Sequence, residues 1–150
     1  MLNRALSICC VLLALGMLAA FGQRTAWAED VAVQSAFESA ARLAVNRRIR
    51  AFNRHDLKAY LDAHHPNVRI YVYPDRLLGQ GRSHLRRIFE PNFQKKDGRI
   101  DVIGQFVVDN FVVSDENLVL GDTSERLVSI YEVVQGRVAS LRLIEARHRK

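Results

Sequence analysis

The sequence predicts an α+β domain in which helices occupy the front half and a run of strands the back half. Apolar residues recur at steps of three and four over roughly 31–54, which is the period of an amphipathic helix. From Arg99 onward, β-branched residues dominate and alternate with polar ones, as in half-buried strands. The order along the chain is helix, helix, strand, helix and then strands. Helices followed by a strand meander are typical of α+β domains.

The first 28 residues have the three parts of a secretory signal peptide. These parts are Arg4, an uncharged run over 5–23, and Ala26-Trp-Ala28 before the expected cleavage site. An uncleaved membrane anchor is the alternative, because the run is near the ~17–25 residues that span a bilayer. The Ala-x-Ala ending favours cleavage, after which no stable membrane insertion is expected. The sequence therefore predicts a leader at 1–28, one domain at 29–150, and a periplasmic or secreted protein exported by a bacterial route.

Composition excludes several classes of function. Both cysteines, Cys9 and Cys10, lie inside the leader, so residues 29–150 contain no disulfide and no thiolate chemistry. The formal net charge of +6 falls to +4 when Arg4 and Arg24 leave with the leader. So mild an excess does not support nucleic-acid binding by an exported protein, and no nucleic-acid partner is predicted.

Two helices are expected before the first strand. The apolar stripe of the first helix consists of Phe37, Ala41, Ala44, Val45, Ile49 and Phe52. Leu57, Tyr60 and Leu61 continue the pattern on a short second helix. Asp56 stands just before that helix, where its carboxylate can accept a free backbone N–H from Lys58 or Ala59. We assign Asp56 to this capping role and not to catalysis.

The segment 68–74 alternates strictly and is the first expected strand. It carries Val68, Ile70 and Val72 on one face and Arg69, Tyr71 and Tyr73 on the other, before Pro74. Two phenols and a guanidinium side by side suit the wall of a half-polar pocket better than a dry core. The sequence thus predicts a cavity here without identifying its ligand.

A turn, a third helix and four strands are expected next. Gly79 and Gly81 mark the turn, and the third helical stripe consists of Leu85, Ile88, Phe89 and Phe93. Pro91 is expected to end or kink this helix. The strands are expected over 100–108, 111–120, 125–134 and 137–145. Asp109-Asn110 and Gln135-Gly136 fit two-residue hairpin turns, so consecutive strands should pair antiparallel.

Three segments carry a resemblance to a known superfamily. They are Arg50-Ala-Phe-Asn-Arg-His-Asp-Leu-Lys-Ala-Tyr60, Ile70-Tyr-Val-Tyr-Pro74 followed by Gly79-Gln-Gly81, and Val128-Ser-Ile-Tyr-Glu-Val-Val-Gln-Gly136 leading into 138–144. Over nearly all of 35–146 the chain resembles the nuclear transport factor 2-like superfamily, and more closely its SnoaL-like, ketosteroid-isomerase-like branch. The resemblance implies a cone-shaped fold, in which a curved, mostly antiparallel sheet wraps around three helices of the N-terminal half and encloses a deep pocket. It specifies a fold better than a reaction.

The resemblance does not extend to the standard isomerase residues. That chemistry needs a carboxylate base for a carbon-bound proton and two acidic donors on the developing enolate oxygen. At the corresponding positions this chain has Tyr73, Arg48 and Ser129. With a reference pKa near ~10, Tyr73 is a poor base at neutral pH.

Arg48 is the central candidate for a polar site, because it lies at the edge of the first apolar stripe. A buried guanidinium needs an acidic partner or a ligand. In one interpretation Arg48, Tyr71 and Tyr73 together hold a carboxylate or enolate-like group. In the other, Arg48 reaches solvent or pairs with Glu125 or Glu145, and both tyrosines pack in the core. The predicted pocket residues are Arg48, Phe52, Tyr71, Tyr73, Phe89, Ser129, Tyr131 and Glu145.

The other polar residues have structural explanations. His64-His65 has no third ligand at metal-binding spacing, so no metal and no other cofactor is predicted. Solvated helix faces account for Arg47, Arg50, Arg54, Arg86 and Arg87, and the basic tail at 147–150 is expected to fray. No Ser-His-Asp order, phosphate-binding loop or dinucleotide glycine pattern occurs.

Two classes of function are left open. The first is a binding or accessory domain that holds a small apolar or amphipathic molecule, or pairs through its sheet, without chemistry. The second is an enzyme of the isomerase, cyclase or dehydratase type, in which Tyr73 or Tyr131 donates a proton and Arg48 stabilises an oxyanion. The lack of an obvious base on the pocket strand favours the first. An inward-facing Glu125 or Glu145 with a raised pKa would favour the second.

The expected sheet also predicts a homodimer. Segments 106–108 and 111–113 carry apolar residues at successive positions, so both faces of the sheet are apolar. The helices can cover one face, and the other face then needs a second copy or a partner protein. Val112 is expected at this interface, so that Val112→Glu would yield a monomer.

Overall fold

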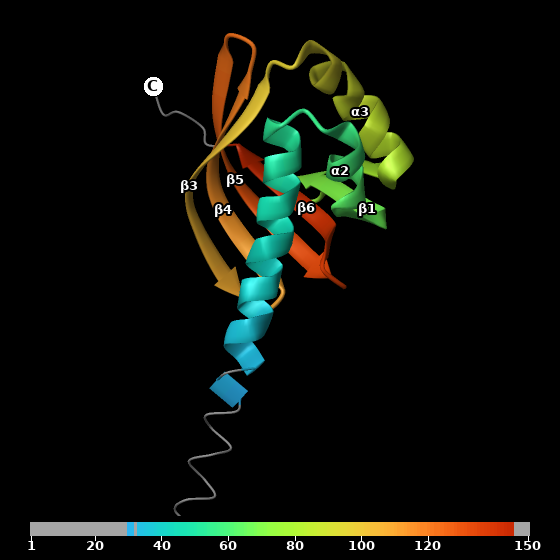
Figure 1. Ribbon diagram of the computed structural model, residues 1–150. Coiled ribbons are helices and arrows are strands. Elements are labelled where there is room, and N and C mark those ends of the chain that lie inside the picture. The colour runs from blue at the N-terminus through green and yellow to red at the C-terminus, as the bar shows by residue number, and fades with distance from the viewer. Residues whose placement is uncertain (1–29, 32, 146–150) are drawn as a thin grey trace, which may run out of the picture. The chain divides into compact units, whose positions relative to one another are not determined.

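The computed structural model describes residues 30–31 and 33–145 (Figure 1). The expected signal peptide and the tail at 147–150 lie outside the described residues. The chain divides into two compact units between Ala36 and Phe37, and the second unit contains the sheet. Within the described ranges, no helix is both long and apolar enough to cross a membrane.

The unit that begins at Phe37 is an α+β fold with an open, mixed sheet of six strands. Its helical segments are residues 37–53 of the N-terminal helix, α2 (Leu57–Asp62) and α3 (Arg82–Lys95). Its strands are β1 (His64–Val72), β2 (Arg76–Gln80), β3 (Gly98–Val108), β4 (Phe111–Leu120), β5 (Thr123–Val134) and β6 (Arg137–Glu145). The strand order is β2-β1-β6-β5-β4-β3 (Figure 1). The predicted α+β class is confirmed.

The back half follows the sequence pattern closely. β4 and β6 have the expected bounds, while β3 and β5 each begin slightly earlier than expected. All four strands pair antiparallel with their neighbours in sequence. The turns contain Asp109 (φ 53°), Gln135 (φ 50°) and Gly136 (φ 69°), and such left-handed backbone is what tight hairpin turns require.

The front half contains one confirmed cap and one correction. Asp56 caps α2, because its Oδ1 accepts the backbone N–H of Ala59 at 2.8 Å. Pro91 was expected to end or kink its helix, and the first of these alternatives is wrong, since α3 continues to Lys95. Proline removes only its own N–H from the helix, and Phe93 in the last turn is buried in the core.

The edge of the sheet next to α3 differs from the expectation. Gly79, expected together with Gly81 to mark a turn, instead lies in β2, which pairs antiparallel with β1. β1 begins at His64, earlier than the expected Val68, and pairs in parallel with β6. Neither pairing has a local sequence signal, because β2 is exposed along most of its length and β6 lies far along the chain.

The helices cover one face of the sheet, called here the inner face; the opposite side is the outer face. The core between them contains Ala41, Ala44, Val45, Ile49, Phe52, Tyr60, Leu85, Phe93, Val112, Tyr131, Val138 and Leu141. Most of the first predicted helical stripe is therefore buried. Phe37 is the exception at 61% exposed, and it lines an open hollow beside the β3–β4 turn. Ile88, predicted for the third stripe, is also exposed.

Val112 does not lie where the sequence analysis placed it. It is fully buried on the inner face, so it cannot report on an interface of the outer face. Strand alternation instead directs its neighbour Val113, together with Val113's cross-strand partner Ile130, to the outer face.

Candidate functional site

A network of buried polar side chains crosses the interior between the N-terminal helix and the sheet. Arg48, only 4% exposed, extends from the helix toward the inner face. Its Nη1 donates to the Tyr131 hydroxyl at 3.0 Å and its Nη2 to the Tyr60 hydroxyl at 3.3 Å. The guanidinium carbon also lies 5.2 Å from the ring centroid of Tyr60 and 5.4 Å from that of Tyr131. Both distances are within the range of cation–π attraction.

Glu116 on β4 is the acidic member of this network. It is 2% exposed, and its Oε1 accepts the Ser129 hydroxyl at 2.5 Å and the Tyr131 hydroxyl at 2.9 Å. The Tyr131 hydroxyl therefore accepts from Arg48 and donates to Glu116. A guanidinium and a carboxyl group are thus joined through one phenol, which supplies the acidic partner that a buried arginine needs.

Electrostatics favour one protonation state for Arg48 and for the two phenols. Burial opposes the charge of Arg48, but Tyr131, Tyr60 and Glu116 outweigh it and raise the pKa of Arg48 above its ordinary value. Burial raises the pKa of Tyr131 and of Tyr60, and the nearby Arg48 charge only partly offsets this. Both phenols therefore keep their protons at neutral pH.

Arg48 and Glu116 also form part of the wall of a largely enclosed cavity of about 40 Å³. The other lining residues are apolar: Phe52, Phe89, Ile100, Leu118, Leu127, Leu141 and Leu143. The Nε of Arg48 is buried and has no hydrogen-bond partner in the described part of the chain. A polar site needs roughly 10–15 Å³ to hold one water. This cavity is therefore large enough for a group of the size of a water molecule.

Three more buried polar atoms lack a partner within residues 37–145, and all three are on the sheet. They are Nε2 of His64, Nε2 of Gln105 and Oγ of Ser114. Gln105 pairs with Ser114 across β3 and β4, and Ser114 pairs with Ser129 across β4 and β5. These three residues form one polar row next to Glu116. On this side of the core, some buried donors and acceptors therefore have no hydrogen-bond partner within the described residues.

His64 is a structural residue with an unusual electrostatic state. Its Nδ1 lies 2.7 Å from the backbone oxygen of Tyr60, which can only accept, so Nδ1 carries the proton. Burial first, and the Arg48 charge second, lower the pKa of His64 to about 3. His65 is directed elsewhere, and its Nδ1 accepts the backbone N–H of Asn67 at 3.3 Å. Among the described residues, no cluster of three or more His, Cys, Asp or Glu could hold a metal ion.

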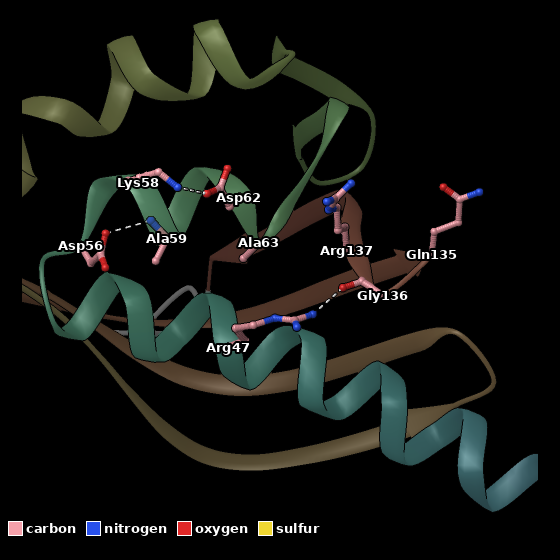
Figure 2. A pocket seen from close by; sticks show the side chains of 9 residues that line it. All are labelled: Arg47, Asp56, Lys58, Ala59, Asp62, Ala63, Gln135, Gly136 and Arg137. Carbon is pink, nitrogen blue, oxygen red and sulfur yellow. Dashed lines mark hydrogen bonds and ion pairs between the residues drawn. The ribbon is translucent and has the colours of Figure 1, made fainter.

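A larger hollow, of about 720 Å³, lies between the N-terminal helix, α2 and the β5–β6 turn (Figure 2). Its charged groups have partners: Arg47 donates to the Gly136 oxygen at 2.7 Å, Lys58 pairs with Asp62 at 2.8 Å, and Asp56 caps α2. None of the buried, unpartnered polar atoms of the described chain lines it. The interior cavity beside Arg48 is therefore the better candidate site, although it is smaller.

Five of the eight predicted pocket residues come together in the interior. Arg48, Phe52 and Phe89 line the cavity, while Ser129 and Tyr131 hydrogen-bond to Glu116. The position that the isomerase resemblance assigned to an acidic donor is thus occupied by a serine that itself donates to a carboxyl group.

The other three predicted pocket residues lie away from the cavity. Tyr71 is on the outer face, where Arg142 packs 4.9 Å from its ring centroid. Tyr73 is 61% exposed and Glu145 is also exposed. The structure therefore does not bring Tyr71 and Tyr73 to Arg48, because alternation along the end of β1 directs Val68, Ile70 and Val72 to the inner face and Tyr71 to the outer face.

The sequence analysis missed Glu116 and Tyr60. The expected partners of Arg48, Glu125 and Glu145, are exposed, so that pairing is wrong. The signal for Glu116 was present, because it shares a period-2 face with Val112, which is buried. No local pattern predicts that Tyr60 meets Arg48, since this contact depends on how α2 packs against the N-terminal helix.

Comparisons with known proteins bear on the fold. No protein-family model matches the chain, and no curated protein matches it in sequence. Solved structures do match. A proposed ketosteroid isomerase from Kribbella flavida has a TM-score of 0.64 at 18% identity, covering 75% of this chain and 82% of its own. An NTF-2 like protein of unknown function from Burkholderia xenovorans has a TM-score of 0.62 at 17% identity, covering 76% and 90%.

An LEH-like epoxide hydrolase from M. tuberculosis is also similar, with a TM-score of 0.61 at 13% identity, covering 73% of this chain and 84% of its own. These matches agree in architecture and differ in the activity that their names give. The chain has the nuclear transport factor 2-like fold, a curved sheet wrapped around helices, as the sequence resemblance implied. At such low identities the likeness defines the fold alone.

Proposed function

We propose that this domain binds a small, mostly apolar and uncharged molecule that carries one oxygen acceptor. The ligand would lie in the interior cavity, with its oxygen facing Arg48. The observation that carries the proposal is the buried Nε of Arg48, a donor without an acceptor in the wall of an apolar cavity. A buried donor left unpaired costs about 1–3 kcal/mol, and a carbonyl, ether or epoxide oxygen would remove that cost.

The balance of charge favours an uncharged ligand. Glu116 already offsets the charge of Arg48 through Tyr131. A ligand carboxylate in the same cavity would place a second negative charge beside Glu116, and a buried charge without its own partner is costly. The carboxylate ligand considered from the sequence is therefore less suitable than a ketone, ether or epoxide.

The size of the cavity implies that binding moves a side chain. About 40 Å³ is enough for the oxygen end of a ligand but not for a ring of carbon atoms. Phe89, Leu118 and Leu143 are the only partly buried members of the apolar wall, so they are nearest to solvent. Phe89 meets Phe52 edge-on at 6.2 Å and is the largest of the three, so we expect its side chain to shift when a ligand enters.

A thermal-shift titration tests the binding function. Cyclohexanone, which is apolar with one acceptor oxygen, is expected to raise the melting temperature of the purified protein with increasing concentration, because a ligand at 100 times its Kd adds about 2.7 kcal/mol to the folded state. Cyclohexanecarboxylate is expected to have no such effect.

The control variants locate the site. Leu118→Phe fills the cavity wall and should abolish the shift, whereas Leu77→Phe, an exposed change on β2, should leave it intact. The proposal fails if Leu118→Phe is stabilised as much as the unmodified protein, or if the carboxylate is the better ligand.

Glu116 favours a second candidate function, an enzyme that moves a proton. A buried carboxyl group in the cavity wall supplies the base that the sequence analysis did not find. Tyr131 would donate a proton, and Arg48 would stabilise a developing oxyanion. Tyr73, which the sequence analysis considered as a proton donor, is exposed and has no part in this candidate function. Structures named as an isomerase and an epoxide hydrolase share this fold, which is compatible with such chemistry.

Hydrogen exchange on a ketone separates catalysis from binding. If Glu116 removes a proton from the carbon beside a bound carbonyl and returns a deuteron, cyclohexanone in D₂O gains deuterium faster than in buffer alone, as read by proton NMR. Glu116→Gln should reduce exchange to the buffer rate, and Asp115→Asn, the neighbouring change on the outer face, should not. Exchange at the buffer rate in the unmodified protein would exclude this activity and leave the binding function standing.

A further inference from the structure

β3 is one of the two edge strands of the sheet, and residues 102–108 of it carry neither a charge nor a proline (Figure 1). This segment is called here the free edge. Several of its side chains are apolar and exposed, including Ile103 at 54% and Phe106 at 64%. Proteins usually protect an exposed edge with charges or proline, because its unpaired backbone groups can pair with another strand. The free edge has only a bulge, between Val102 and Gly104.

Asn53 shows which backbone groups of β3 point away from the sheet. Its side-chain oxygen accepts the N–H of Ile100 at 2.8 Å, and its side-chain nitrogen donates to the Ile100 oxygen at 2.8 Å. These are the two bonds that a neighbouring strand would make. They are possible because an antiparallel strand directs both backbone groups of every second residue away from its partner. Asn53 therefore takes the place of a neighbouring strand at this one residue.

The next residues that point outward lie within the free edge. The bulge shifts the alternation by one residue, and the β3–β4 turn fixes it again, because the closing pair Val108 and Phe111 bonds directly across the ladder. Gln105 and Val107 therefore direct their N–H and C=O groups away from β4. Within the described residues, no backbone group of another segment bonds to them. The free edge thus presents alternating donors and acceptors without partners.

The opposite edge of the sheet, β2, is better protected. His84 of α3 donates from Nε2 to the Leu78 oxygen at 3.0 Å, since a carbonyl oxygen can only accept. Arg76 places a charge at the start of this five-residue strand. Of the two edges, β3 is therefore the one that is open for pairing.

We propose that the free edge binds an extended segment of another protein, which joins the sheet as a seventh strand. Alternating backbone donors and acceptors are satisfied together by another extended chain. Beside Phe106, the outer face favours apolar or β-branched residues in the partner. Asp109 is exposed at the end of the free edge, so a lysine or arginine at that end of the partner would meet an opposite charge. The inference uses the sheet edge alone and is independent of the interior cavity.

A second copy of the chain offers Asp109 no such charge. We consider an antiparallel second copy in which Gln105 and Val107 pair with these same two residues. Asp109 would then lie opposite one of three residues, none of them basic: Asp101, Ile103 or Gln105. The charge at this end of the free edge therefore favours a different protein.

Amide hydrogen exchange followed by NMR tests the site. In the free protein the N–H groups of Gln105 and Val107 should exchange fast, whereas that of Phe106, paired with Val113 in the ladder, should exchange slowly. The probe is the acetylated and amidated peptide Lys-Val-Thr-Val-Thr-Val-Lys. At about ten times its Kd, it should slow the exchange of Gln105 and Val107 by about tenfold. The same peptide with glutamate at both ends should bind more weakly, because it meets Asp109 with a like charge.

Two variants should abolish binding and keep the circular dichroism spectrum of the folded protein. Gln105→Pro removes an outward N–H and no ladder bond, and edge strands tolerate proline at such a position. Ile103→Lys places a charge in the free edge, as protected edges have. Leu77→Lys is the matched control, because Leu77 on β2 is 51% exposed against 54% for Ile103, and it should bind the peptide like the unmodified protein.

Four results would each overturn the proposal. The first is that the lysine peptide leaves the exchange of Gln105 and Val107 unchanged at every concentration. The second is that both amides already exchange slowly in the free protein, which would mean that the edge is covered. The third is that Gln105→Pro and Ile103→Lys, both folded, still bind the peptide. The fourth is that light scattering gives twice the mass of one chain and Ile103→Lys halves it, since a second copy would then occupy the edge.

Discussion

Arg48→Met is expected to lower the free energy of unfolding by about 3–5 kcal/mol, because it leaves Glu116 buried without a cation. The change also removes the donor to Tyr131 and to Tyr60, whose hydroxyls are buried. For a domain of this size the loss corresponds to a fall in melting temperature of roughly 10–20 °C. Thermal and urea unfolding followed by circular dichroism measure both quantities.

A surface arginine is the control for this change. Arg126 makes shorter contacts than Arg48, at 2.6 Å and 2.9 Å to Asp115, but the pair is exposed. Exposed ion pairs contribute about 0–1 kcal/mol, so Arg126→Met should have a small effect. Equal losses for Arg48→Met and Arg126→Met would contradict the structural importance of the buried network.

The double variant Arg48→Met with Glu116→Leu distinguishes two contributions to the loss of stability. One is the lost attraction between the two side chains, and the other is the cost of leaving a buried charge without a partner. Removing both members of a buried pair is often close to neutral, whereas removing one is not. The two single losses should therefore add up to more than the loss in the double variant, with a coupling of about 0.5–3 kcal/mol. Strict additivity would mean that Arg48 and Glu116 do not interact through Tyr131.

Acid is expected to destabilise the domain through His64. The pKa of this side chain is about 3 in the folded state, against 6.5 ordinarily, because it is buried and lies near Arg48, with Arg82 contributing less. Between these values the unfolded chain binds a proton that the folded domain does not. Stability should therefore be unaffected by His64 above pH 6.5 and fall as the pH drops toward 3, with a slope of up to about 1.4 kcal/mol per pH unit.

Two histidine variants isolate this contribution from that of the carboxyl groups. His64→Asn keeps a donor for the Tyr60 oxygen and does not titrate, so its stability should decline less between pH 7 and pH 4 than that of the unmodified protein. His65→Asn, at the partly exposed neighbouring position, should follow the unmodified curve. Parallel curves for all three proteins would show that His64 does not titrate as its burial implies.

The elements that sequence predicted well are those governed by local rules. The strands from β3 to β6 alternate every second residue, and Asp109-Asn110 and Gln135-Gly136 are turn formers at their junctions. Asp56 caps α2 through a contact with a residue three positions away. These features depend on the residues that form them and on near neighbours, so they are visible in the chain itself.

The wrong predictions share one physical cause. Each concerned a feature that depends on contacts between segments far apart in the sequence. β2 forms because β1 is available to pair with it, and β1 joins β6 in parallel. Tyr71 and Tyr73 were placed in the pocket on composition, but the face that a strand turns inward depends on what covers it. Phe37 continues an apolar helical stripe and yet is 61% exposed, because it lies beside the open hollow at the β3–β4 turn.

By itself, the sequence determined the α+β class, the strand meander, the superfamily resemblance and the special position of Arg48 at the edge of an apolar helix. The tertiary structure decided which groups meet Arg48. Burial makes a partner necessary, but any of several acidic residues could satisfy it, and only the register of β4 and β5 brings Glu116, Ser129 and Tyr131 to one place. Periodicity shows which face of an element is buried, whereas the chemistry of a site depends on which faces are buried together.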